Sequence, residues 1–287
     1  MRLGAHMSIA GGMDRAPLRG RQAGCDTIQV FTKSNRQWHA KPLDEREVEA
    51  FKANLVSTGI DPVVAHDCYL VNLAAPSTSV WKKSLAAFRV EMERAERLGI
   101  PYLVTHPGSH LAAGEADGIA RVGEALNILH AALPGQRLQV LLETTAGQGT
   151  SLGYRFEQLA AILAQLEQAG RVGVCLDTCH LFAAGYDIRS AAGYRRTMRE
   201  LATTLGLTRV KAIHLNDSQK GLGSRVDRHE HIGEGALGLP AFRWLLNDPR
   251  LRRVPMILET PKDPDFVTAD RRNLARLRAL LNHGGRK

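Results

Sequence analysis

The chain has 287 residues, of which 44% are hydrophobic, 23% charged and 5% aromatic, and its 38 Lys and Arg against 29 Asp and Glu give a formal net charge of +9. This length and composition exclude collagen-like, coiled-coil and disordered proteins, and no apolar run approaches the ~20 residues that a membrane-spanning helix needs. The first residues have no apolar stretch typical of a signal peptide, and four cysteines in so long a chain do not make a disulfide framework. The sequence therefore predicts a cytoplasmic protein that makes no membrane contact. Its positive charge is compatible with a polyanionic partner without requiring one.

Short, largely apolar, β-rich runs recur from one end of the chain to the other. Such runs are typical of strands that are buried on both faces of a parallel sheet. The eight predicted strands cover residues 2–6, 27–31, 62–66, 102–106, 138–143, 172–177, 210–215 and 254–259.

Amphipathic stretches with helical spacing separate these strands. After the second strand, the apolar residues Val48, Phe51, Leu55 and Val56 share one predicted helix face. Similar faces follow the third strand (Trp81, Leu85, Phe88, Met92 and Ala95) and the eighth strand (Leu274, Leu277, Leu280 and Leu281, before the tail HGGRK). The chain therefore alternates between strands and helices throughout.

Eight strand–helix units without a linker or a shift in composition predict one α/β domain over residues 1–287, a (β/α)8 TIM barrel. The alternative is a doubly wound open sheet, which usually carries a phosphate-binding glycine loop after its first strand. Gly4-Ala5-His6 does not form such a loop, so we predict the barrel, with its active site at the carboxyl ends of the strands.

Side chains that can bind metal stand at or next to the carboxyl ends of seven predicted strands. They are His6, His66, His106, Glu143, Asp177, His214 and Glu259. Any one of them could be a core histidine or a helix-capping carboxylate, but seven at one barrel mouth have no structural explanation. The sequence therefore predicts a metal site at the mouth.

Further ligand-type residues follow in the loops. His180 comes three residues after Asp177, and Asp227 and His229 form a D-x-H pair whose side chains share one side of an extended segment. His231 is either another ligand or a solvated histidine. Nitrogen and oxygen donors without thiolate favour Zn²⁺, with Mn²⁺ or Fe²⁺ as alternatives. We interpret Cys175 and Cys179 as small packing residues.

Several long segments stand in order along the chain: FTKSNRQW (31–38), HDCYLVNLAAP (66–76), THPGSH (105–110), LLETTAGQG (141–149), GVCLDTCHLFAAGYD (173–187), HLNDSQKGLGSRVDRHEHIGEG (214–235) and LETP (258–261). Together they resemble the signatures of the endonuclease IV family, the zinc-dependent apurinic/apyrimidinic endonucleases of base-excision repair. The resemblance extends from Gly4 to about Pro261 and implies a (β/α)8 barrel. Ser34, Cys68 and Thr144 depart from the Asn, Ser and Asn that are common in the family, and none of them is an implied ligand.

The resemblance also implies three zinc ions per chain and cleavage of duplex DNA on the 5′ side of abasic sites. The products would be a 3′-hydroxyl and a 5′-deoxyribose phosphate, and the enzyme, a monomer, would also trim blocked 3′ ends. Glu143 would bridge two ions and act as the base that orients the attacking hydroxide. The implied ligand groups are His66, His106 and Glu143; Glu143, Asp177, His214 and Glu259; and His180, Asp227 and His229.

An abasic nucleotide inside a duplex reaches metals in a barrel mouth only if it rotates out, and the gap in the stack must then be filled. Side chains that could insert into this gap as a wedge lie in the loops after the second and third strands: Arg36, Gln37, Tyr69 and Leu70. In the resembling family the matching Arg, Tyr and Leu positions penetrate the DNA. We expect Trp38 to pack against a neighbouring helix instead. We also expect positive charge to gather at the mouth through Lys33, Arg36, Arg225 and Arg228.

Two other functions remain open from the residues alone. A metal-dependent sugar isomerase or epimerase shares the barrel and the acidic and histidine strand ends, but it uses fewer ligands and needs no basic rim. A non-catalytic scaffold that binds DNA or zinc is the other alternative, and the full ligand set disfavours it.

Overall fold

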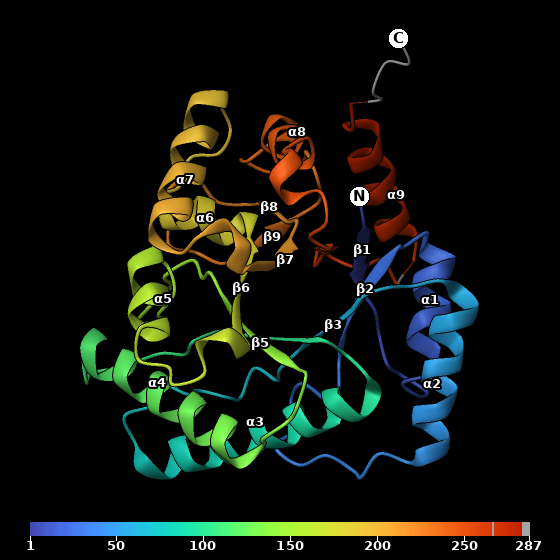
Figure 1. Cartoon of the computed structure of the whole chain (residues 1–287). Helices are drawn as coiled ribbons and strands as arrows, with labels where there is room; N and C mark the ends of the chain where they lie inside the picture. Colours follow the sequence, from blue (N-terminus) through green and yellow to red (C-terminus); the bar gives the residue numbers. More distant parts are fainter. Residues whose placement is uncertain (266, 283–287) are drawn as a thin grey trace.

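Residues 1–265 and 267–282 are described by a computed structural model, in which a ring of helices encloses a barrel of parallel strands (Figure 1). The barrel strands are β1 (Leu3–His6), β2 (Thr27–Phe31), β3 (Val63–His66), β4 (Tyr102–Thr105), β5 (Gln139–Glu143), β6 (Val172–Asp177), β7 (Val210–His214) and β10 (Met256–Leu258). Their order around the closed barrel is β1-β10-β7-β6-β5-β4-β3-β2. The barrel closes where Leu3 of β1 pairs with Met256 of β10.

This architecture confirms the predicted fold. All eight predicted strands form, and β2 and β6 have the predicted bounds. The last predicted strand, 254–259, is shorter than expected, so that Glu259 lies just beyond Leu258 at the carboxyl end of β10. His106 likewise follows the last residue of β4.

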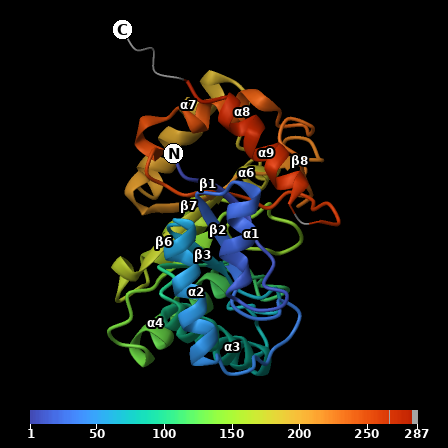
Figure 2. The same ribbon diagram turned by 90° about the vertical axis from the view of Figure 1, so that its right-hand side faces the viewer.

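The helices cover the outside of the barrel, and Figure 2 shows α1 and α2 side by side over the first strands. Their bounds are α1 (Arg15–Ala23), α2 (Glu45–Thr58), α3 (Thr78–Leu98), α4 (Glu115–Ala132), α5 (Phe156–Leu163), α6 (Thr178–Ala184), α7 (Ala191–Thr204), α8 (Leu239–Leu246) and α9 (Thr268–Ala279). Within the described ranges, none of these helices has the length and apolar character that crossing a membrane requires.

The predicted helix faces are mostly correct. Val48 and Phe51 of α2 are buried, as are Phe88 and Met92 of α3. Val56 was expected on the buried face of α2, but it is 85% exposed, because in this turn Leu55 packs against the core and the next residue points away from it. The tail HGGRK, residues 283–287, lies outside the described residues.

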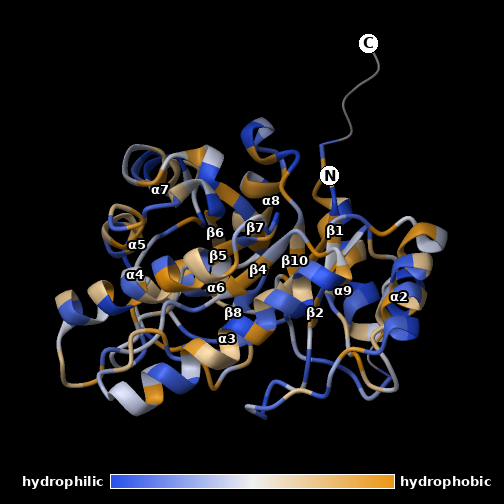
Figure 3. Cartoon of the chain, turned by 60° about the horizontal axis from the view of Figure 1, so that its bottom comes forward, coloured by the Kyte–Doolittle hydropathy of each residue, from blue (hydrophilic) through white to orange (hydrophobic). Residues whose placement is uncertain are grey.

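Two apolar layers stabilise the barrel. One lies between the strands and the surrounding helices, and the other fills the interior of the barrel. Figure 3 shows hydrophobic residues gathered on the central strands. The inner layer consists of Val64, Val104, Leu141, Cys175, Ala212 and Ile257, packed with Tyr102. Because side chains alternate along a strand, the residue two positions further along each of these strands also faces inward, one level higher.

Candidate metal centre

The level above the inner apolar layer consists of the predicted ligands. Two positions after the six inner-layer residues come His66, His106, Glu143, Asp177, His214 and Glu259. The alternation of the strands therefore brings six side chains from six strands to one mouth, above a floor that excludes water. Among the described residues, four groups of His, Cys, Asp and Glu lie close enough to hold a metal ion, and three of these match the predicted ligand groups.

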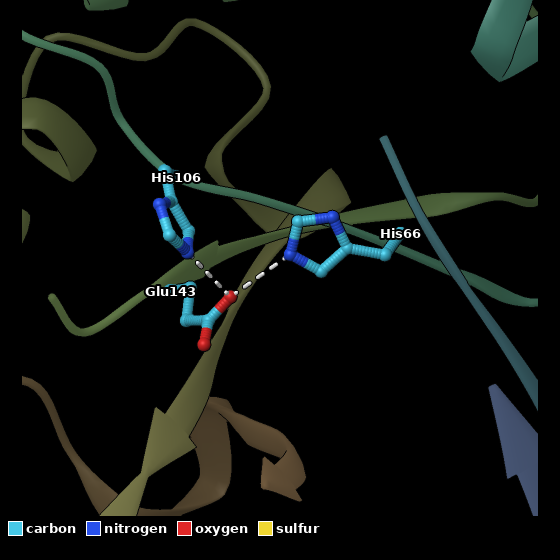
Figure 4. A group of neighbouring side chains, drawn as sticks. All are labelled: His66, His106 and Glu143. Carbon is cyan, nitrogen blue, oxygen red and sulfur yellow. Dashed lines mark hydrogen bonds and ion pairs between the residues drawn. The ribbon is translucent and has the colours of Figure 1, made fainter. Parts of the chain in front are cut away.

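The first group is built around one oxygen of Glu143. Nε2 of His66 and Nε2 of His106 each lie 3.2 Å from Oε2 of Glu143 (Figure 4). His66 and Glu143 are buried, whereas the His106 side chain is 39% exposed at the rim of the mouth. The two rings point at the same carboxylate oxygen from neighbouring strands, which is an arrangement that a shared cation would stabilise.

The second group uses the other oxygen of Glu143. Nδ1 of His214 lies 2.9 Å from Oε1 of Glu143 and 3.2 Å from Oε2 of Glu259. Oδ2 of Asp177 is 3.8 Å from the same nitrogen. One histidine therefore faces three carboxylates, and Glu143 belongs to both groups.

The third group depends on the loop after β7. This loop forms a two-stranded ribbon, β8 (Asp217–Ser218) with β9 (His229–Glu230), which brings His229 back over the mouth. Oδ1 of Asp227 lies 3.3 Å from Nε2 of His229, and Oδ2 of Asp227 lies 3.1 Å from Nε2 of His180. Asp177 connects this group to the second one, because its Oδ2 is 3.7 Å from Nε2 of His229.

Four of the histidines use one ring nitrogen for a hydrogen bond that fixes the ring. Nδ1 of His66 donates to the carbonyl of Asp67 (2.8 Å), and Nδ1 of His180 donates to the carbonyl of Thr144 (2.7 Å). The ring of His229 is 3.1 Å from the carbonyl of Glu259, and that of His214 is 2.7 Å from Oε1 of Gln29. In each case the other nitrogen faces the carboxylates, as in metal sites whose histidines are oriented by outer hydrogen bonds.

The charges at the mouth alter the pKa of each other's groups. Burial raises the pKa of Glu143, but His214 and His106 outweigh it and hold that pKa well below its usual range. Burial also opposes ionisation of Asp227, yet His180 and His229 lower its pKa to about 2. These carboxylates are therefore ionised near neutral pH, which is the state that binds a metal cation.

The donor set fits divalent ions. Nε2 of His229 is buried and, within residues 1–265 and 267–282, makes no hydrogen bond, although carboxylate oxygens surround it. A buried nitrogen without a partner is costly unless something else binds it. All three groups offer imidazole nitrogen and carboxylate oxygen without thiolate, which suits Zn²⁺ and also permits Mn²⁺ or Fe²⁺.

Two predicted candidates, His6 and His231, lie outside the three groups or at their edge, as do the two cysteines near the site. Nδ1 of His6 is 3.7 Å from Glu259, and His231 instead contacts Asn273, 3.0 Å away. Cys175 packs in the inner apolar layer, as interpreted. Cys179 lies near Asp177 and His229, but burial raises its pKa to about 12, which disfavours the thiolate, and its sulfur donates to the carbonyl of Arg228 (3.6 Å).

Three residues around the ligands were not recognised as part of the site. Gln29 contacts both His214 and Glu259, and Asn216 donates to Oδ2 of Asp177 (2.6 Å). The hydroxyl of Thr144, one of the departures from the family pattern, accepts from the backbone N–H of Asp177 (2.9 Å). A polar residue within an apolar strand, as in TIQVF, is the sequence signal that could have identified Gln29.

The residues predicted to enter DNA lie at the surface. Arg36 and Gln37 are exposed, and Tyr69 is 67% exposed, with its ring edge-on to Phe31 at 5.6 Å. Leu70 is half-buried. Tyr69 lines a hollow of about 210 Å³ together with His66 and His106. Trp38 is half-buried, and the ammonium group of Lys83 on α3 lies 4.4 Å from its ring centre, so it contacts a neighbouring helix as expected.

The expectation for Lys33 is wrong. Its side chain is 3% exposed, and its ammonium group lies 3.2 Å from Glu91 on α3 and donates to the carbonyl of Gln37 (2.6 Å). Lys33 is buried because Glu91 compensates its charge, so it holds the loop rather than presenting charge at the mouth. Arg225 and Arg228 are exposed as expected, and the Arg225 guanidinium lies 4.5 Å from the ring centre of Tyr154.

Comparisons with known proteins point to one family. A family model described as a xylose isomerase-like TIM barrel matches residues 19–281. A relative from Chloroflexus aurantiacus named probable endonuclease 4 is 56% identical over 98% of both chains. A relative of the same name from Geobacter sulfurreducens is 56% identical over 97% of this chain and 94% of its own. The crystal structure of endonuclease IV from Thermus thermophilus superposes with a TM-score of 0.85, at 40% identity over 98% of both chains.

More distant structures share the architecture. D-Psicose 3-epimerase from Clostridium cellulolyticum has a TM-score of 0.71, but it is only 13% identical over 98% of this chain and 99% of its own. This likeness shows the fold alone.

Proposed function

Because the chain belongs to the endonuclease IV family, it is a nuclease that acts on DNA, and we propose that it cuts duplex DNA on the 5′ side of abasic sites. The products would be a 3′-hydroxyl and a 5′-deoxyribose phosphate, and the same site would remove blocking groups from 3′ ends. The sugar isomerase or epimerase alternative shares only the fold with this chain.

The observation that supports this proposal is the position of Glu143 between two ligand groups, with a third group beside them. We propose three zinc ions per chain, held by His66, His106 and Glu143; by Glu143, Asp177, His214 and Glu259; and by His180, Asp227 and His229. When bound, such ions supply positive charge that lowers the pKa of water and stabilises the charge that develops on the phosphate and on the leaving oxygen.

The residues of the chain would orient the reactants. Glu143, whose two oxygens face different histidines, would orient the attacking water through a carboxylate oxygen. The inner apolar layer below the ligands excludes bulk water from that side, which strengthens the electrostatic interactions within the site. No protein acid is needed for the leaving oxygen.

The exposed residues of the rim would recognise the lesion. Tyr69 lies beside the hollow that His66 and His106 line, so a ring inserted into the DNA would sit next to the ligands. Arg36, Gln37 and Leu70 would complete the wedge that replaces the extruded nucleotide. An intact base pair resists extrusion more than an abasic site does, so the wedge provides selectivity without reading a base.

The test combines metal analysis of the purified protein with incision of a duplex that contains one tetrahydrofuran abasic analogue. We expect close to three zinc ions per chain and a single cut on the 5′ side of the analogue. An undamaged duplex of the same sequence is the control, and a duplex with a 3′-phosphate tests end trimming. Incision that persists after prolonged chelation, with metal shown to be absent, would overturn the proposal.

A further inference from the structure

Gln29 is a buried amide in the middle of β2, and its side chain reaches the second ligand group from inside the barrel. It has no exposed surface. Its Oε1 lies 2.7 Å from Nε2 of His214, and its Nε2 donates to Oε1 of Glu259 (2.5 Å). The same amide nitrogen is 3.0 Å from Nδ1 of His6. One side chain thus contacts two of the four residues in this group.

Only one orientation of the amide satisfies these neighbours. The carboxylate of Glu259 can only accept, so the amide NH₂ must face it and the carbonyl oxygen must face His214. The carbonyl can accept only if Nε2 of His214 carries the proton. In the neutral ring, which is the form that binds a metal ion, Nδ1 of His214 is then without a proton, and it is this nitrogen that faces Glu143 and Glu259.

The histidine that Gln29 orients differs from the others in how its ring is held. His66, His180 and His229 face backbone carbonyls, which no substitution removes. The tautomer of His214 depends instead on a side chain. We propose that Gln29 is a positioning residue for the His214 group: it sets the His214 tautomer and holds the Glu259 carboxylate, so that this group binds its metal ion more tightly than the same ligands would without the amide.

This inference rests on the proposed metal-binding function, and the experiment separates the two. Gln29→Met keeps the length of the side chain but removes both hydrogen bonds. Outer hydrogen-bonding partners of metal ligands typically contribute about 10–100-fold to affinity. We expect one of the bound zinc ions to be released at about 10–100-fold lower chelator concentration than in the wild type, while the remaining ions are unaffected. Release is followed with a chromogenic chelator, and the cobalt-substituted protein should show a changed visible spectrum for that one ion.

Two further variants complete the test. Gln139→Met makes the same substitution at the start of β5, where the amide donates to the Gly170 carbonyl (3.1 Å), and should release metal as the wild type does. Gln29→Glu keeps an acceptor for His214 but places a carboxylate against Glu259, so it should also weaken the binding of one zinc ion. This variant provides the measurement if Gln29→Met does not fold. If both Gln29 variants release all their ions at the same chelator concentration as the wild type, the inference is overturned. A wild-type protein that binds no divalent ion would overturn the proposed function instead.

Discussion

Nδ1 of His214 lies 2.9 Å from Oε1 of Glu143, although the two residues are 71 positions apart in the chain. The other oxygen of Glu143 is 3.2 Å from His66 on the opposite side. A single carboxylate thus connects ligand groups that come from different parts of the barrel. Replacing it should affect both groups at once.

Glu143→Ala should abolish most of the incision activity while the barrel remains folded. In the proposed three-zinc centre Glu143 is shared by two ions, so its removal should cost several kcal/mol of transition-state stabilisation, or about 10³-fold or more in rate. The measurement is the rate of tetrahydrofuran-duplex incision together with zinc content. Glu157→Ala, an exposed carboxylate on α5, is the control. A Glu143→Ala protein that cuts at near the wild-type rate would contradict the assignment.

Tyr69→Ala and Arg36→Ala should retain zinc and thermal stability but bind abasic duplex more weakly. Stacking of an aromatic side chain on a base contributes about 1–3 kcal/mol, which corresponds to roughly 5–150-fold in affinity. Fluorescence anisotropy with abasic duplexes of different flanking sequence measures the loss, which should depend little on sequence. Arg89→Ala, on the outer surface of α3, should bind like the wild type. If both rim variants bind abasic duplex like the wild type, the proposed wedge is contradicted, but the proposed metal site is not.

Affinity for abasic duplex should fall steeply with salt. The formal charge is +9, and Arg36, Arg225 and Arg228 are exposed on the loops after β2 and β7. Each phosphate neutralised should contribute about 0.9 to the slope of log affinity against log salt concentration. Replacing Arg228 with Ala should reduce that slope by about one if this residue binds a phosphate. An affinity that does not change with salt would contradict this prediction.

Lys33→Met should destabilise the protein, because it leaves Glu91 buried without its cation. Breaking one partner of a buried ion pair costs about 3–5 kcal/mol, whereas replacing both partners by apolar residues is often close to neutral. Urea denaturation of the single variant and of Lys33→Met/Glu91→Leu measures the difference. The double variant should regain most of the loss. Additive losses would mean that the pair does not act as a unit.

The metal-free and zinc-loaded proteins should differ in how their stability depends on pH. Burial lowers the pKa of His66 and of His180, but the carboxylates around them raise both well above 6.5. The metal-free protein therefore gains stability that is fully present below 6.5 and is lost as the pH rises through these raised values. Zinc needs neutral imidazole, so its affinity should rise over the same range. The metal-free protein should therefore lose stability over this range, and bound zinc should offset that loss. Thermal melts of stripped and zinc-loaded protein measure both, and an equal loss in the two forms would contradict the prediction.

The barrel and the clustering of the candidate ligands were predictable from the sequence because both depend on local patterns. Apolar strands that end in His, Glu or Asp predict inward-facing polar residues at one mouth. His66 lies above Val64, and Glu143 above Leu141, because residues two positions apart on a strand face the same side. Gln29 was not predictable as a site residue, because its partner His214 is 185 positions away. Lys33 was misjudged for the same reason, since the Glu91 that neutralises it belongs to a helix beyond the next strand.

Closure of the barrel by β10 has a consequence for synthesis of the protein. The His214 group acquires Glu259 only after β10 has been translated and has paired with β1 and β7. A ribosome-bound chain that has not yet reached β10, or a product truncated before it, contains His66, His106 and Glu143 but lacks a carboxylate of the second group. Such an incomplete polypeptide cannot assemble the whole group, and we therefore expect it not to cut DNA.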